Sequence, residues 1–197
     1  MRRSLLVVLL AGFFATSAGP AVAADAEAPY KVGDRLAQPA SSASSVYKER
    51  GWDALIPKDW NPIKELRALK LGALKDSDPR ADEAMRKMRK LWDAAPIETS
   101  LRGERIRIAG FMVPLERKGD QITEFLLVPY FGACIHVPPP PANQIIHVIT
   151  RKPLKNAQAM SAVWVSGTVD IAHADSIWGA SGYKMNADVI APYKETR

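Results

Sequence analysis

The sequence of 197 residues has only one cysteine, Cys134, and three histidines. A single cysteine cannot form an intramolecular disulfide, so in an exported chain the thiol must be buried, bound to a ligand or reactive. The motifs of a phosphate-binding loop, a serine nucleophile elbow and a paired-carboxylate site are missing as well. Beyond the N-terminus, no run is apolar enough to cross a bilayer. These absences exclude a disulfide-stapled fold and give no support to the commonest hydrolase and nucleotide-binding classes.

Residues 1–23 have the features of a secretory signal peptide. Arg2 and Arg3 precede an apolar run, residues 5–14, and an Ala-Val-Ala sequence that ends at Ala23 suits a cleavage site. The run is too short to span a bilayer, so we expect a periplasmic protein cleaved after Ala23 or the next alanine, without a membrane span. Cleavage lowers the formal charge from +6 to +4. Because this modest charge is spread along the chain, it favours a solvated exterior over an anionic surface or partner. An exported protein is not expected to bind nucleic acid.

The composition of the next segments predicts a flexible lead-in and a helical extension. Residues 24–46 are rich in alanine, proline and serine and have no apolar period, as in a flexible linker. Residues 47–98 contain two helix start signals, Asn61-Pro62 and Asp78-Pro79. The helix after the second signal has the clearer apolar period. We expect this helix to bury three side chains against a sheet: Met85, Met88 and Trp92.

From residue 99 onward, apolar and polar residues alternate, as in β-strands, and the helical period is lost. The alternating segments are residues 105–115, 122–128, 145–150, 162–171 and 183–189. Gly110 and Gly167 lie inside two of these segments, as at the corners of a barrel. In the last segment we expect one face to hold Tyr183, Met185, Ala187 and Val189. The pattern predicts a mainly β fold: a five-stranded OB-like barrel over residues 99–197, preceded by a short helical region. A short helix fits residues 153–160, and a small open β-sandwich is the alternative.

The candidate functional stretch lies between the second and third predicted strands. Cys134 and His136 are two residues apart, so an extended backbone would place both side chains on one face. Four prolines follow and predict a stiff polyproline II spacer: Pro138, Pro139, Pro140 and Pro141. The amides of Asn143 and Gln144 come next and could orient a ligating imidazole.

A thiolate and an imidazole at a fixed spacing suit zinc, with copper second. We expect Cys134 and His136 to lie close to His147 at one edge of the barrel. His147 would either supply a third metal ligand or be a hydrogen-bonded histidine within its strand. Three protein ligands would leave an open coordination position. His173, in an Ala-His-Ala-Asp sequence, is more typical of a surface residue. Two alternatives stay open for Cys134: a buried small hydrophobic residue, or a thiol activated by His136.

Three motifs carry a resemblance to a known family. They are G-F-M-V-P-L from Gly110, E-F-L-L-V-P from Glu124 and G-A-C-I-H-V-P-P-P-P-A-N-Q from Gly132. Residues 101–193 thereby resemble a family of small exported bacterial proteins of unknown function with an OB-like domain. Genes of that family often lie in zinc-responsive operons beside ABC-type transporters, so the resemblance implies zinc and an envelope transporter component as partner. The resemblance implies no catalytic residue. The residues that match the signature of the family are Cys134, His136, Pro138, Pro139, Pro140, Asn143 and Gln144.

The sequence therefore leads to three functional hypotheses. The leading one is a periplasmic metal-handling accessory that binds or passes zinc near an envelope transporter. The second is a non-catalytic interaction module whose rigid proline loop docks onto a partner. The third is a thiol enzyme that uses Cys134 and His136.

Overall fold

The computed structural model describes residues 30–37, 46–63, 67 and 78–194. The predicted signal peptide, residues 1–23, lies outside this part of the chain. Pro62 and Ile63 are helical, as the first start signal predicts, and most of the helix expected after them is also outside the described residues. In the part described, no helix is long and apolar enough to cross a membrane.

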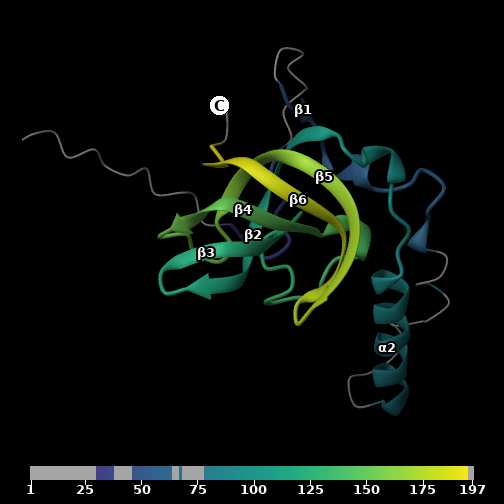
Figure 1. Ribbon diagram of the computed structural model, residues 1–197. Helices are drawn as coiled ribbons and strands as arrows, with labels where there is room; N and C mark the ends of the chain where they lie inside the picture. Colours follow the sequence, from purple (N-terminus) through teal and green to yellow (C-terminus); the bar gives the residue numbers. More distant parts are fainter. Residues whose placement is uncertain (1–29, 38–45, 64–66, 68–77, 195–197) are drawn as a thin grey trace, which may run out of the picture.

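The centre of the molecule is a closed barrel (Figure 1). Its strands are β2 (Arg105–Lys118), β3 (Gln121–Val128), β4 (Ile146–Lys155), β5 (Ala162–Ser176) and β6 (Gly179–Pro192). They pair in the order β2-β3-β4-β6-β5, and β5 returns to pair with β2. The β4–β6 pair is parallel and the other pairs are antiparallel. A two-residue strand, β1 (Lys48–Glu49), adds in parallel to β2. The prediction of a mainly β, OB-like barrel is confirmed, and each predicted strand is longer than the sequence pattern showed.

Two glycines turn the barrel corners as predicted. Up to Phe111, β2 pairs with β5, and from Phe111 onward it pairs with β3. A Cβ on Gly110 would lie 2.8 Å from the carbonyl oxygen of Val128, so only glycine permits this crossing. A Cβ on Gly167 would meet the carbonyl oxygen of Asn186 even more closely.

The alternating residues of the strands fill the barrel interior. This inner cluster consists of buried side chains from all five strands together with Trp52, Leu55 and Leu101 from outside the barrel. Ile106 and Ile108 of β2, and Tyr183 and Met185 of β6, belong to it as the alternation predicts. Val189 does not, since it is 53% exposed. The β5–β6 register shifts beside Gly167, where β6 has one extra residue. Val189 therefore lies on the opposite face of the strand from Ala187, and the prediction that it shares the buried face is wrong.

Short helices cap the barrel, while the long helix extends away from it. Helix η1 (Trp52–Leu55) is held by the Tyr183 hydroxyl, which donates to the Leu55 carbonyl over 2.6 Å. The remaining short helices are η3 (Thr99–Leu101) and η4 (Ala142–Gln144). No helix occupies the predicted residues 153–160, because β4 continues to Lys155 and residues 156–161 form a turn region.

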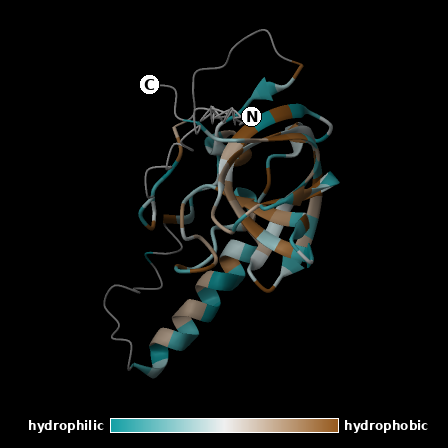
Figure 2. Ribbon diagram, turned by 90° about the vertical axis from the view of Figure 1, so that its left-hand side faces the viewer, coloured by the Kyte–Doolittle hydropathy of each residue, from teal (hydrophilic) through white to brown (hydrophobic). Residues whose placement is uncertain are grey.

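Helix α2 (Pro79–Asp93) begins at the predicted cap, where the Asp78 side chain accepts a hydrogen bond from the Arg80 amide. The helix projects from the barrel (Figure 1), and hydrophilic and apolar residues alternate along it (Figure 2). Met88 is buried, Trp92 is half-buried and Met85 is 41% exposed. The expectation that α2 buries all three side chains against the sheet is therefore wrong for Met85.

A second apolar cluster lies outside the barrel, on the opposite side of β2 and β3. Its buried members are Leu36, Ala109, Phe111, Val113, Leu126, Val128, Ala133, Ile145, Met160, Ala162, Trp164 and Tyr193. We call it the outer cluster. The loop between β3 and β4 and the segment of residues 30–37 both contribute to it, so the candidate functional stretch is built onto this layer.

Candidate functional site

The proline loop, residues 130–141, starts with a tight turn rather than an extended strand. The Gly132 carbonyl accepts hydrogen bonds from the amides of Ile135, His136 and Val137, the second over 2.8 Å. Cys134 has a φ of 66°, in the left-handed region that non-glycine residues seldom adopt. The expected extended backbone around Cys134 and His136 is therefore wrong. The side chain of Cys134 packs against the outer cluster, whereas His136 is exposed.

The environment of Cys134 disfavours its thiolate. Burial raises the pKa of the Cys134 thiol to about 12. Burial is also the main cause of the raised pKa of Tyr130, and the charge of the neighbouring Cys134 is the second cause. No neighbouring cation lowers the pKa of Cys134. At neutral pH the side chain is a protonated thiol, a weak nucleophile that packs like a small apolar residue.

The four prolines are fixed from two sides. Pro139 lies against Gly179, the first residue of β6 after the β5–β6 turn, where an added Cβ would be 2.9 Å from the proline ring. Pro138 and Pro139 also line a small cavity with Met88 and Trp92 of α2. Pro140 is buried and Pro138 is exposed. The run thus contributes to the contact between the long helix and the barrel, and the loop leaves residues 135, 136 and 138 at the surface.

Asn143 and Gln144 tie the barrel to the chain that precedes it. The Asn143 amide nitrogen donates to the Pro96 carbonyl over 2.9 Å, and that of Gln144 donates to the Trp52 carbonyl over 3.3 Å. Both side chains are buried, and the Asn143 Oδ1 atom has no partner in the part of the chain described here. The two amides were expected to orient a histidine ligand, and their nitrogens instead bond to backbone carbonyls of the N-terminal extension.

His147 lies on β4 and uses its imidazole in a contact with a carboxylate. Its Nε2 atom is 2.7 Å from Oε2 of Glu124 on β3, and the pair is partly buried. Ile146 and Val148 point into the barrel, so His147 faces outward. His147 was expected to form a three-ligand metal site with Cys134 and His136, and the structure does not place these three side chains together in such a site. Across the described ranges, no three His, Cys, Asp or Glu side chains are placed to hold a metal ion.

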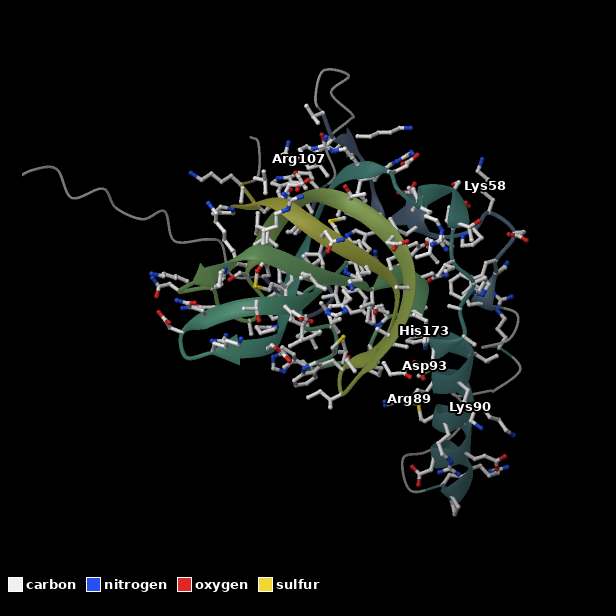
Figure 3. The ribbon with its side chains drawn as sticks, in the orientation of Figure 1. Lys58, Arg89, Lys90, Asp93, Arg107 and His173 are labelled. Atoms are coloured by element: carbon white, nitrogen blue, oxygen red, sulfur yellow. The ribbon has the colours of Figure 1, made fainter. Side chains whose placement is uncertain are left out.

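His173 lies on β5 at the surface, beside the end of α2. Its Nε2 atom is 3.3 Å from the Asp175 carboxylate, which is mostly exposed. His173, Lys90 and Asp93 line an open cleft of about 440 Å³ between β5 and α2, with their side chains on its two sides (Figure 3). The cleft is wide and its charges are mixed. It does not contain Cys134 or His136, so the two candidate regions are separate.

Residues 30–37 hold the start of the proline loop, a role that the sequence did not indicate. The Gly33 amide donates to the Phe131 carbonyl, and the Phe131 amide donates to the Asp34 carbonyl, both over 2.9 Å. The Tyr30 ring packs edge-on against Phe111 at 5.1 Å. This part of the predicted flexible lead-in, residues 24–46, is therefore ordered and paired. The apolar residues Tyr30, Val32 and Leu36 could have indicated this packing, but the segment as a whole is dominated by alanine, proline and serine.

Comparison with known proteins identifies relatives without assigning a function. A family model described as a protein of unknown function, DUF3299, matches residues 52–192. The crystal structure of a DUF3299 family protein from Pseudomonas aeruginosa PAO1 is similar with a TM-score of 0.60 and 35% sequence identity. The match covers 78% of this chain and 100% of that chain. A search of curated proteins gave no significant match. The expected likeness to a family of unknown function is thus confirmed, and the genomic association with zinc stays a prediction.

Proposed function

The chain belongs to the DUF3299 family, whose function is unknown, and we propose that it is a non-catalytic protein-interaction module that presents its proline loop to an envelope partner. The observation that carries this proposal is a rigidly held loop with an exposed apolar tip. Residues 30–37, helix α2 and the β5–β6 turn all contact the loop. Rigidity lowers the entropy lost on binding, which is the main advantage of a preformed loop.

The exposed surface of the loop continues onto the neighbouring turn. Ile135 is 37% exposed, and Ile177, in the β5–β6 turn, is 88% exposed. The contact between Pro139 and Gly179 brings this turn to the proline run. Large apolar side chains exposed on two neighbouring segments favour a protein partner. The protonated thiol of Cys134 supports packing and argues against a thiol enzyme. We propose a protein of the envelope, such as a transporter component, as the partner.

Site-specific photo-crosslinking in cells tests this proposal. A photoreactive amino acid at position 135 or 177 should give the same crosslinked protein, identified by mass spectrometry. The control position is Val46, which is 70% exposed and lies two residues before the short strand β1. Ile135→Asp should abolish the crosslink formed from position 177, because a carboxylate in an apolar contact loses its hydration. Crosslinks no stronger at 135 and 177 than at 46 would end the docking proposal.

Zinc handling is the second candidate, favoured by the presence of Cys134 and His136 in one turn. These two residues alone do not form a closed site, and a partner or water would have to complete the coordination. Binding would also release the Cys134 proton, so affinity should rise with pH. Cobalt titration of the reduced protein provides the test: a thiolate charge-transfer band should appear and be absent in Cys134→Ser. If cobalt gives no such band at pH 8, the zinc proposal is abandoned.

A further inference from the structure

A second binding surface lies where β4 and β6 separate. The two strands pair in parallel from Ile146↔Tyr183 to Thr150↔Ala187, and the pairing stops there. Beyond this point β4 remains attached to β3, through Leu154 and Lys155, while β6 continues along β5 as far as Pro192. Residues 151–155 and 188–192 therefore face one another without a ladder between them. We call this opening the β4–β6 groove.

The groove has volume and an apolar floor. Two cavities of about 350 and 240 Å³ lie along it, and both are lined by Leu154 and Ile190. Met112 and Val163, which are almost fully buried, line the larger cavity. Val189 of β6 is 53% exposed close by. A groove with these dimensions and this lining suits the alternating side chains of an extended peptide segment.

The backbone of β6 offers a hydrogen-bonding edge to such a segment. The Tyr193 amide donates to the Ala162 carbonyl on β5 over 3.0 Å. In an antiparallel pair the bonded positions alternate, so the polar groups of Ala191 also face β5 and those of Ile190 face the groove. Pro192 and Pro153 supply no amide donor and limit the ladder to a few residues. The free edge is therefore short and lies on β6.

The charges around the groove are mostly positive. Arg151, Lys152 and Lys155 line the two cavities. Asp188 is the one acid among the described lining residues, and its carboxylate already lies 2.8 Å from Arg151. Lys152 and Lys155 are exposed. An acidic segment would meet an attractive potential here, and a basic one would be repelled.

From this geometry we propose that the β4–β6 groove binds an extended, acidic segment of a partner protein, which adds as a short strand to the edge of β6. Strand addition obtains affinity from backbone hydrogen bonds and specificity from alternate side chains, as the groove provides. The proposal goes beyond the docking function of the proline loop and does not depend on it. The groove and the loop use different residues, so each can fail alone.

A peptide titration of the isotope-labelled full chain, followed by NMR, tests the proposal. The probe is an acetylated, amidated hexapeptide of alternating glutamate and valine. We expect its largest shifts at the amides of residues 188–191, together with slower hydrogen exchange of the Ile190 amide. A lysine–valine peptide is the control for charge. The glutamate–valine peptide with alternate N-methyl groups is the control for backbone pairing, and both should bind at least tenfold more weakly.

Charge reversal on the protein gives the matching control. Lys152→Glu with Lys155→Glu should weaken binding of the acidic peptide at least tenfold, and Lys58→Glu, at another exposed lysine, should leave it unchanged. Ile135→Asp should also leave it unchanged, which separates this proposal from docking at the proline loop. Three results would overturn the proposal: equal binding of the N-methylated peptide, shifts that map elsewhere, or an Ile190 amide already protected because a second copy or another segment of this chain fills the groove.

Discussion

The two apolar clusters of this protein differ in how they are assembled. The inner cluster draws mainly on residues that alternate along five strands, and these strands pair with one another around the barrel. The outer cluster combines strand residues with loop residues such as Ala133 and with Leu36 from the N-terminal segment. The first is therefore centred on the barrel strands, with Trp52, Leu55 and Leu101 added by short helices, while the second depends on the proline loop and residues 30–37 folding onto the barrel.

This difference separates the stability of the protein from its proposed function. A closed barrel retains its inner cluster even when a loop moves, since the strand ladder is continuous. The proline loop has no such ladder and is held by hydrogen bonds to residues 33 and 34 and by packing. Substitutions in the inner cluster should unfold the whole chain. Substitutions in the outer cluster should release the loop first.

The largest effect should come from Phe125→Ala in the inner cluster. Phe125 is fully buried, and truncation of a buried phenylalanine costs about 3–5 kcal/mol through lost apolar burial and the remaining cavity. Chemical denaturation should show this loss in the free energy of unfolding. A loss below about 1 kcal/mol would mean that the interior is loosely packed and would remove the contrast between the two clusters.

Gly167→Ala should have the next largest effect, because it tests the barrel corner. The new Cβ would meet backbone atoms of Asn186 and would lie 3.0 Å from the Ala187 Cα atom. Backbone cannot rotate away as a side chain can, so we expect a cost of about 1–3 kcal/mol, as for overpacked cores. Thermal unfolding measures it, with Thr168→Ala on the same strand as the control. Equal stability of the two variants would contradict the close crossing of β5 and β6.

Phe131→Ala should release the proline loop without unfolding the barrel. The Phe131 ring is half-buried and packs against Phe111 with ring centroids 5.6 Å apart. Partial burial implies a loss of about 1 kcal/mol, and maleimide should react faster with Cys134. Hydrogen exchange should increase at residues 131–137 and stay unchanged in β2 and β5. Equal acceleration throughout the barrel would show that loop and barrel unfold together.

Near neutral pH the smallest effect should be that of Cys134, because its thiol contributes a pH dependence of stability only in alkaline solution. Its pKa is raised from 9.0 to about 12 by burial, so above pH 9 the unfolded chain loses the thiol proton more readily than the folded chain. The free energy of unfolding should therefore be insensitive to this group below pH 9 and fall as the pH rises toward 12. Cys134→Ala should make that decline shallower. An identical decline in both proteins would place the thiol in water.

The sequence by itself determined the five strands, the corners at Gly110 and Gly167 and the start of α2 at Asp78, because each follows from a local pattern. Strand alternation and helix capping act over a few residues and can be read without knowing the fold. Only the tertiary structure decided the left-handed turn at Cys134, the exposure of Val189 and the pairing of His147 with Glu124. The loop that contains this turn is anchored through Phe131 to residues 33 and 34. The facing of Val189 follows a register shift between strands, and the histidine contact crosses between neighbouring strands. These interactions join residues distant in the chain, so no local pattern of the sequence contains them.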